Sequence, residues 1–369
     1  MGNKRLLIVT SYISGNGGIE RVIQKMDSIL KDKLSDKLVC EILSLSGGDC
    51  VEKARKCWIS GTGNEKWLNG LNSTRVPLVS KFKIVTLFMH SVALLFKILF
   101  GGYSYVLCTG PFQVYLLKRI KEIFRKKYII YAWPHFSLDA GHGKNELIKH
   151  ADYFLAISKD IIPQFSDLGV NENRIIYFPN PFYDFSNEIE NYKKTTNDSV
   201  NLVYIGRLLF EGQKRVKDLL EAISKTINPV KLTIIGDGQD YNKIVDYIKG
   251  KKLENNVKIM KGWHDNPWEK VENVDFLILT SAYEGLPTVL GEALSRGIKV
   301  ITSDCKTGPR DFVTPENGYI YPVSDISALS KIIDSCYQSG DYDRYSISKT
   351  MSEFYPDSYV HRICEMLKL

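Results

Sequence analysis

Several familiar features are missing from this chain of 369 residues. Its seven cysteines are scattered and form no CxxC pair, so neither a zinc site nor a disulfide framework is indicated. Reduced thiols are typical of a cytoplasmic protein, and Cys108 and Cys305 lie in apolar runs that predict core positions. No signal peptide is expected, because the start "KRLLIVTSY" lacks a full hydrophobic region and a cleavage site.

An unbroken membrane-spanning run is missing as well. The best candidate, residues 81–102, is interrupted by His90, Ser91 and Lys97, whereas a spanning helix needs about 20 predominantly apolar residues. We therefore expect a buried helix here, with one face available for a peripheral membrane contact.

Acidic residues are scarce in the first half of the chain. Residues 1–182 carry 25 Lys and Arg against 15 Asp and Glu, whereas the remainder carries 24 against 27. This imbalance predicts an anionic partner, either a membrane surface or a phosphorylated acceptor, with a solvated basic face as the alternative. The basic run at residues 117–128 has helical spacing but no RNA-binding signature, so no nucleic-acid partner is expected.

The chain is instead rich in short apolar runs that alternate with helical patterns. This alternation predicts an α/β protein with parallel sheets covered on both faces. The polar stretch 183–200 reads as a linker, because it has no strand-like run. We therefore predict two Rossmann-like doubly wound domains facing a central cleft, at residues 1–182 and 201–340, followed by a helical tail at 341–369.

Ligands of such sheets bind beyond the carboxyl ends of the strands, so residues after each run are the site candidates. Gly17 and Gly18 form a turn before a helix but do not fit GxGxxG, which disfavours dinucleotide binding. His135 follows the run "KYIIYAWP", where it either contacts a ligand or only packs, and Asp139 lies four residues on.

Basic residues gather at the start of one later helix. Arg207 follows the run "NLVYIG", and Lys214, Arg215 and Lys217 precede or begin the next helical stretch. Because helix N-termini bind anions, this cluster predicts a phosphate site, with surface charge as the alternative. The loops that hold Gly236, Lys261 and Trp263 follow two further runs and are candidates to line a nucleotide pocket.

Two acids stand in "YEGLPTVLGEALSRG", residues 283–297. Glu284 is expected in the loop and Glu292 on the helix, with Pro287 in the first helical turn. Carboxylates accept hydrogen bonds from hydroxyls, so the pair is suited to grip two polyhydroxy parts of one elongated ligand. An acid–base dyad is less natural, because the two side chains come from different turns.

Three blocks carry a family likeness: "GRLLFEGQKRVKDLLEA", "YEGLPTVLGEALSRG" and "SDCKTGPRDFV". In this order they resemble the retaining glycosyltransferases of the GT-B fold, family 4. The likeness covers nearly the whole chain and is strongest over about 201–323. More narrowly, "WPHFSLD" with the first block resembles the bacterial galactosyltransferases of lipopolysaccharide core synthesis.

The resemblance implies a role for each candidate. The N-terminal domain would bind the acceptor and the C-terminal domain a UDP-sugar, with the last helix crossing back to the N-terminal domain. Arg207 and Lys214 match the family's diphosphate-binding pair, but about two extra residues near Gly212 and Gln213 leave Lys214 and Arg215 both open. The remaining implied roles are Glu284 and His135 in catalysis, Gly17 and Gly18 near the diphosphate, Glu284 with Gly285, Leu286, Pro287 and Thr288 at the donor sugar, and Glu292 at the ribose.

The family generally works without a metal, and the UDP-sugar is a substrate, so no cofactor is expected. The literal DxD at residues 341–343 follows no strand and reads as a surface turn. The favoured function is transfer of a hexose, with galactose as the best guess, to a saccharide acceptor of lipopolysaccharide core or a related surface polysaccharide, in the cytoplasm or on the cytoplasmic face of the inner membrane.

Other functions stay open at this point. Within the family, the donor is alternatively UDP-glucose, UDP-N-acetylglucosamine or UDP-N-acetylgalactosamine, on a capsule, O-antigen or lipid-linked acceptor. More remote readings are a nucleotide-sugar epimerase, against which the basic first half and the aromatic "YAWPHF" argue, and a non-catalytic binding subunit, against which the retained Arg207, Lys214, Glu284 and Glu292 argue.

Overall fold

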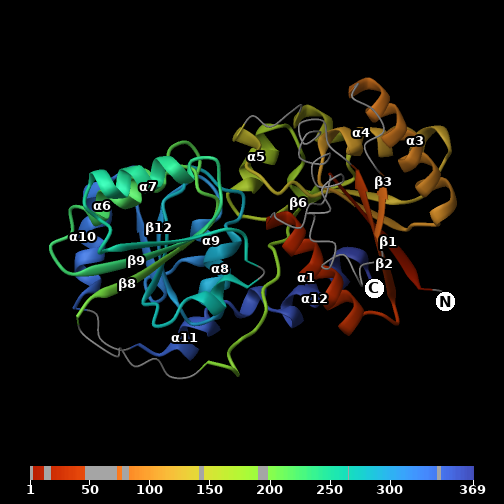
Figure 1. Ribbon diagram of the computed structural model, residues 1–369. Helices are drawn as coiled ribbons and strands as arrows, with labels where there is room; N and C mark the ends of the chain where they lie inside the picture. Colours follow the sequence, from red (N-terminus) through yellow and green to blue (C-terminus); the bar gives the residue numbers. More distant parts are fainter. Residues whose placement is uncertain are drawn as a thin grey trace. The chain divides into compact units, whose positions relative to one another are not determined.

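The chain folds into two compact units (Figure 1). The computed structural model describes residues 3–11, 18–45, 73–76, 83–140, 145–189, 198–264, 266–338 and 342–369. The first unit consists of Met1–Pro181 and Pro356–Leu369, and the second of Phe182–Tyr355. Each unit has its own parallel sheet and its own apolar core.

The first unit is built on a seven-stranded parallel sheet with the order β3-β2-β1-β4-β5-β6-β7. The chain therefore moves outward from β1 in one direction and then returns to continue from β4 in the other, which is a doubly wound topology. The strands are β1 Lys4–Ser11, β2 Leu38–Leu45, β3 Ser73–Val76, β4 Tyr105–Cys108, β5 Ile129–Ala132, β6 Tyr153–Ala156 and β7 Ile175–Tyr177.

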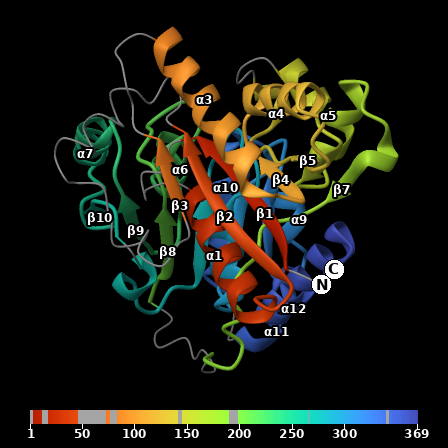
Figure 2. The ribbon, with the colours of Figure 1, turned by 90° about the vertical axis from the view of Figure 1, so that its right-hand side faces the viewer.

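Helices cover this sheet (Figure 2). They are α1 Gly18–Lys33, α3 Lys83–Gly101, α4 Pro111–Ile123, α5 Ile161–Asp167 and α12 Pro356–Leu367. The C-terminal α12 belongs to this unit although it follows the second one in sequence. The Tyr131 hydroxyl on β5 donates a hydrogen bond to the Met366 carbonyl at 2.9 Å, which attaches the chain end to the first sheet.

The second unit is built on a six-stranded parallel sheet with the order β10-β9-β8-β11-β12-β13. Its strands are β8 Val200–Ile205, β9 Val230–Gly236, β10 Val257–Lys261, β11 Phe276–Leu279, β12 Lys299–Ser303 and β13 Gly318–Tyr321. Its helices are α6 Val216–Ile223, α7 Tyr241–Gly250, α8 Thr288–Ser295, α9 Pro309–Phe312, α10 Ile326–Cys336 and α11 Arg344–Lys349. The winding direction reverses between β8 and β11, so the carboxyl ends of these two strands flank the topological switch point where ligands of such sheets bind.

The second unit extends past residue 340, the boundary expected from the sequence. The short helix α11 stays with it because polar side chains fix it there. Ser348 donates to the Ser295 carbonyl at the end of α8 at 3.0 Å, and Arg344 donates to the Val274 carbonyl at 2.8 Å. The linker expected at 183–200 is described only in part, since residues 190–197 lie outside the described residues.

The prediction of a buried helix at residues 81–102 is wrong. Helix α3 does form there, but only 22% of its segment Ile84–Gly101 is buried. With a mean hydropathy of 2.0, that segment is long and apolar enough to cross a membrane by length and composition alone. Residues 81 and 82 lie outside the described residues.

The prediction that Cys108 and Cys305 are core residues is confirmed, since both are buried.

Candidate functional site

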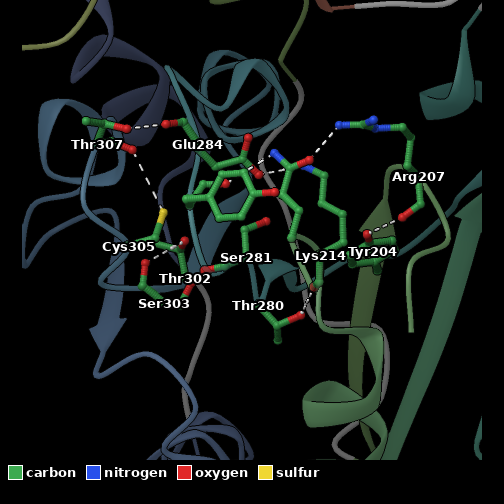
Figure 3. A network of polar contacts seen from close by, with 12 residues as sticks. Tyr204, Arg207, Lys214, Thr280, Ser281, Glu284, Thr302, Ser303, Cys305 and Thr307 are labelled. Carbon is green, nitrogen blue, oxygen red and sulfur yellow. Dashed lines mark hydrogen bonds and ion pairs between the residues drawn. The ribbon is translucent and has the colours of Figure 1, made fainter. Parts of the chain in front are cut away.

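Three site candidates of the second unit, Arg207, Lys214 and Glu284, lie on the loops that follow β8 and β11 (Figure 3). The backbone turns very tightly where β8 and β9 end. Gly236 has a φ of 155°, and a Cβ on it would collide with the Gly206 carbonyl oxygen. Glycine at this position therefore lets the two strand ends approach closely, and Arg207 leaves β8 immediately afterwards.

Lys214 and Glu284 form an ion pair between the β8 and β11 loops. The Lys214 Nζ atom lies 2.6 Å from Glu284 Oε1, and the two side chains are only 12% and 10% exposed. The Thr280 hydroxyl, directly after β11, donates to the Lys214 carbonyl at 2.8 Å. A cation and a carboxylate with little solvent around them are thus fixed at the switch point, where they interact more strongly than on an open surface.

Gln213 ties the same two loops together beside this ion pair. Its side-chain oxygen accepts a hydrogen bond from Arg207 Nη2 at 2.6 Å, and its side-chain nitrogen donates to the Tyr283 carbonyl at 3.2 Å. Its backbone carbonyl accepts from the Ala282 amide at 2.8 Å. One residue therefore holds the guanidinium of Arg207 and the backbone preceding Glu284. In the sequence, this position stands out only as extra length.

Arg215 is directed elsewhere. Its guanidinium donates to both carboxylate oxygens of Asp218, at 2.6 and 3.2 Å, within the first turn of α6. Its backbone has a φ of 50°, a left-handed conformation at the residue that precedes α6. Lys214 and Arg215 are thus neighbours in sequence with different partners, and only Lys214 faces the acid loop.

The turn after β12 packs against the loop from Glu284 to Pro287. The Thr307 hydroxyl donates to the Glu284 carbonyl. Gly308, with a φ of 94°, lies so close to Leu286 and Pro287 that a Cβ there would collide with them. Pro287 is the N-cap of α8 and not its first helical residue, so the N–H groups of the first turn, from Thr288 onward, lie at the helix end that favours anions.

Glu292 lies inside α8 and is 9% exposed. Its Oε2 atom accepts a hydrogen bond from the indole nitrogen of Trp268 at 3.3 Å. Arg296, one turn further on, donates to the Glu292 carbonyl at 2.9 Å, and its guanidinium lies 5.0 Å from the Trp268 ring centre. The placement of Glu284 in the loop and Glu292 on the helix is as predicted, but Trp268 as a partner of Glu292 was missed, because it comes from a distant part of the sequence.

The residues proposed for nucleobase loops lie together at one sheet edge. Gly236 and Lys261 are register partners at the ends of β9 and β10, and the Gly236 carbonyl accepts from the Gly262 amide at 2.9 Å. Lys261 Nζ lies 4.2 Å from the centre of the Tyr241 ring, and Trp263 is 46% exposed. The structure thus brings these three residues near one another.

His135 belongs to the first unit, after β5. Its ring lies edge-on to Trp133 with centroids 4.3 Å apart, and its Nε2 atom has no hydrogen-bond partner among the described residues. Burial lowers the pKa of His135 to about 3, so the ring is neutral near pH 7. Gly18 begins α1 and is exposed, while Gly17 lies outside the described residues. The roles that the resemblance implies for these three residues stay predictions.

The described residues contain no group of three or more His, Cys, Asp or Glu side chains placed to hold a metal ion. Of the literal DxD, Asp343 caps α11 by accepting from the Tyr345 amide at 2.9 Å, and Asp341 lies outside the described residues.

Cys305 borders the acid loop, but burial and, secondarily, the charge of Glu284 raise its pKa to about 12. Its thiol is therefore protonated and unsuited to act as a nucleophile.

Two doubly wound α/β units, one of them with a base and acid pair at its switch point, are the arrangement of glycosyltransferases of the GT-B type. A family model described as "Glycosyl transferases group 1" matches residues 186–351. The lipopolysaccharide 1,6-galactosyltransferase of Salmonella typhimurium is 33% identical over 367 residues, covering 96% of each chain. The chain belongs to this group 1 family, GT4, whose members are retaining hexosyltransferases.

Solved structures agree with this assignment. The lipopolysaccharide outer core galactosyltransferase WaaB in its apo form aligns with a TM-score of 0.83 and 29% identity, over 99% of this chain and all of that one. Anabaena HepE in complex with UDP aligns with a TM-score of 0.74 and 16% identity, over 98% of this chain and 99% of that one. At 16% identity the second likeness concerns the fold alone.

Proposed function

We propose that this protein transfers galactose from UDP-galactose, with retention of configuration, to a saccharide acceptor of lipopolysaccharide core or a related bacterial surface polysaccharide. The observation that carries the proposal is the Lys214–Glu284 ion pair at the switch point, with Arg207 held beside it by Gln213. The 33% identity to a lipopolysaccharide 1,6-galactosyltransferase over 96% of both chains supports the choice of sugar and acceptor.

The proposal assigns a role to each of these side chains of the second unit. Lys214, not Arg215, is the base for the diphosphate, because Arg215 is occupied by Asp218. Together Lys214 and Arg207 stabilise the negative charge that develops on the departing UDP. Glu284 and the first turn of α8 face the sugar that is transferred, and Glu292 accepts hydrogen bonds from the ribose hydroxyls.

The transfer proceeds on one face of the sugar. The bond between the sugar C1 and the diphosphate oxygen breaks, and its electron pair leaves with UDP. The acceptor hydroxyl oxygen then bonds to C1 on the same face, and its proton goes to the departing phosphate oxygen. This route needs no enzyme carboxylate as a base, which fits a Glu284 that is already paired with Lys214.

A donor panel tests this proposal. The purified protein is incubated with UDP-galactose, UDP-glucose, UDP-N-acetylglucosamine and GDP-mannose, first in a thermal-shift assay and then with lipopolysaccharide core acceptor that lacks galactose. We expect the largest stabilisation and transfer with UDP-galactose, and an α-anomeric product by NMR. Transfer of another sugar at an equal or higher rate would refute the galactose assignment, and an inverted product would refute retention.

For the site of action, we propose the cytoplasmic face of the inner membrane. The excess of basic residues in the first half of the chain supports this location. A UDP-sugar donor is also a cytoplasmic metabolite. Fractionation of cells that express the tagged full-length chain tests the proposal, and recovery entirely in the soluble fraction at low salt would contradict it.

A further inference from the structure

Helix α3 presents a stripe of large apolar side chains to solvent. Ile84 is 81% exposed, Phe88 65%, Phe96 56% and Phe100 78%. These positions are four or eight residues apart, so they lie on one face of the helix. The opposite face is packed, with Leu94 and Ile98 fully buried or nearly so. Isolated exposed apolar residues are ordinary, but a continuous stripe of this kind indicates an interaction surface.

Basic residues lie directly beside this stripe, at the end of α4. Lys126 Nζ donates to the Leu99 carbonyl at 3.0 Å, which fixes the end of α4 against the end of α3, and both ribbon views show the two helices side by side (Figures 1 and 2). Arg119, Arg125 and Lys127 are exposed there. Residues 81–128 contain nine Lys and Arg but one acid, Glu122.

Apolar and basic side chains are mixed at this junction. Ile123 is 71% exposed and Phe124 44%, and both stand between the exposed Arg119 and Arg125. We call the exposed residues of α3 together with those at the end of α4 the α3–α4 surface. An apolar face flanked by cations is the arrangement of a helix that lies in the interface of a bilayer with anionic lipids.

The packed face of α3 favours a helix that lies on a membrane surface over one that spans the membrane. Lys97 Nζ is 2.8 Å from Glu41 Oε2 on β2, and the Glu41 side chain is only 9% exposed. His90 and Thr86 are buried on the same side. A spanning arrangement would pull α3 off the sheet, separate this ion pair and place Lys97 in hydrocarbon, which is strongly unfavourable.

We propose that the α3–α4 surface docks the protein on an anionic lipid bilayer, with Phe88 and Phe100 inserted among the acyl chains and the bases of α4 at the headgroups. A second copy of the chain fits this surface less well. A symmetric dimer through it would bring the two basic clusters together, and like charges across an interface disfavour association. A bilayer containing phosphatidylglycerol complements both the apolar and the charged residues.

This inference rests on the proposed function only for the statement that the acceptor lies at a membrane. Docking is a property of the first unit, whereas the donor site candidates Lys214, Glu284 and Glu292 belong to the second. Binding to vesicles without substrates therefore tests docking alone. Transfer to a detergent-solubilised acceptor tests the proposed function alone.

Vesicle flotation of the full-length protein is the deciding experiment. Vesicles of phosphatidylethanolamine with phosphatidylglycerol are compared with vesicles of phosphatidylcholine. The wild type should float with the anionic vesicles and be released by high salt. The double variant Phe88→Ser/Phe100→Ser should lose at least about tenfold in partitioning, because two exposed aromatic side chains no longer enter the bilayer. The variant Arg125→Gln/Lys127→Gln should lose roughly tenfold on anionic vesicles only.

Matched controls lie in the second unit. Ile227→Ser removes an apolar side chain that is 91% exposed. Lys251→Gln/Lys252→Gln removes two exposed adjacent charges. Lys252, like Arg125, has a left-handed backbone, so the two charge variants are matched in this respect. Both controls should bind vesicles like the wild type, and all variants should keep the wild-type melting temperature and UDP affinity.

Two results would overturn the proposal. The first is equal partitioning of the Phe88→Ser/Phe100→Ser variant and the wild type. The second is a wild-type dimer in sedimentation velocity that this variant dissolves, which would assign the surface to a second copy of the chain.

Discussion

The Nζ atom of Lys214 lies 2.6 Å from Oε1 of Glu284, and this ion pair joins the loops after β8 and β11. Without a ligand, each side chain neutralises the other in a site with little solvent. A diphosphate bound here offers Lys214 a second anionic partner, and a sugar hydroxyl offers Glu284 a donor. Under the proposed function, the ion pair keeps both groups in place before the donor arrives, which lowers the ordering cost of binding.

The first prediction separates Lys214 from Arg215. Lys214→Gln should weaken UDP binding by about tenfold to a hundredfold, because a charge-assisted contact to the diphosphate is lost. It should change uridine binding much less, since uridine has no phosphate. Isothermal titration with UDP and uridine measures both effects.

Arg215→Gln is the matched control for this experiment. It removes the same charge, but from a side chain that is bound to Asp218. A loss of UDP affinity equal to that of Lys214→Gln would show that Arg215 is the diphosphate base after all.

The second prediction concerns turnover. Glu284→Gln should lower kcat by about a hundredfold to a thousandfold, because the carboxylate no longer stabilises charge at the sugar. UDP affinity should change by no more than a few fold, since the variant releases Lys214 for the diphosphate. Steady-state kinetics with UDP titrations check this division, and a loss of UDP affinity that accounts for the whole defect would contradict it.

The third prediction assigns Glu292 to the ribose. Glu292→Gln should reduce the discrimination between UDP and 2′-deoxy-UDP, because an amide is a weaker acceptor for the ribose hydroxyls than a carboxylate. Trp268→Phe removes the indole N–H that donates to Glu292 and keeps an aromatic ring at that position, so it should move the same ratio in the same direction by a smaller factor. If neither variant alters the ratio of the two affinities, Glu292 does not contact the ribose.

The fourth prediction makes Gln213 a positioning residue. Gln213→Ala removes the hydrogen bonds that hold Arg207 and the Tyr283 carbonyl. We expect kcat to fall by about tenfold with little change in melting temperature, because the side chain acts on loops and not on the core. Gln213→Glu keeps an acceptor for Arg207, so it should recover part of the activity if the contact with Arg207 is what matters. A purely structural role would instead lower the melting temperature of the Ala variant.

The sequence predicts the strands that carry the site but not the contacts between their loops. The runs that became β8 and β11 are apolar throughout because both faces of the sheet are covered, so they were predicted with Arg207 and Glu284 at their ends. Lys214 and Glu284 are 70 residues apart in sequence, so no local pattern reveals their pairing. Trp268 reaches Glu292 through tertiary packing alone.

Edge elements and exposure are harder to predict for a related reason. The edge strands β7 and β13 are three and four residues long, too short for a period to show, and were not predicted. The apolar run of α3 has the composition of a core helix, and only the packing of its neighbours decides which of its faces is covered.

The last prediction follows from Glu41, which anchors α3. Burial acts to raise the pKa of this carboxylate, but hydrogen bonds from Lys97, Arg5 and Tyr103 outweigh it and hold the pKa at about 2. Because the folded pKa lies below the ordinary glutamate value of 4.5, the stabilisation is complete above that value and is lost as the pH falls toward the folded pKa.

Glu41→Gln should therefore lower the free energy of unfolding by about 3 kcal/mol near neutral pH, and the difference from the wild type should shrink toward zero as the pH approaches about 2. Urea titrations across this range measure it. Glu211→Gln is the control, because Glu211 pairs with Lys217 at the surface, where the two side chains are 57% and 36% exposed and an ion pair contributes little. A constant difference between Glu41→Gln and the wild type at every pH would mean that the variant perturbs packing and that the ion pair does not hold α3 to the sheet.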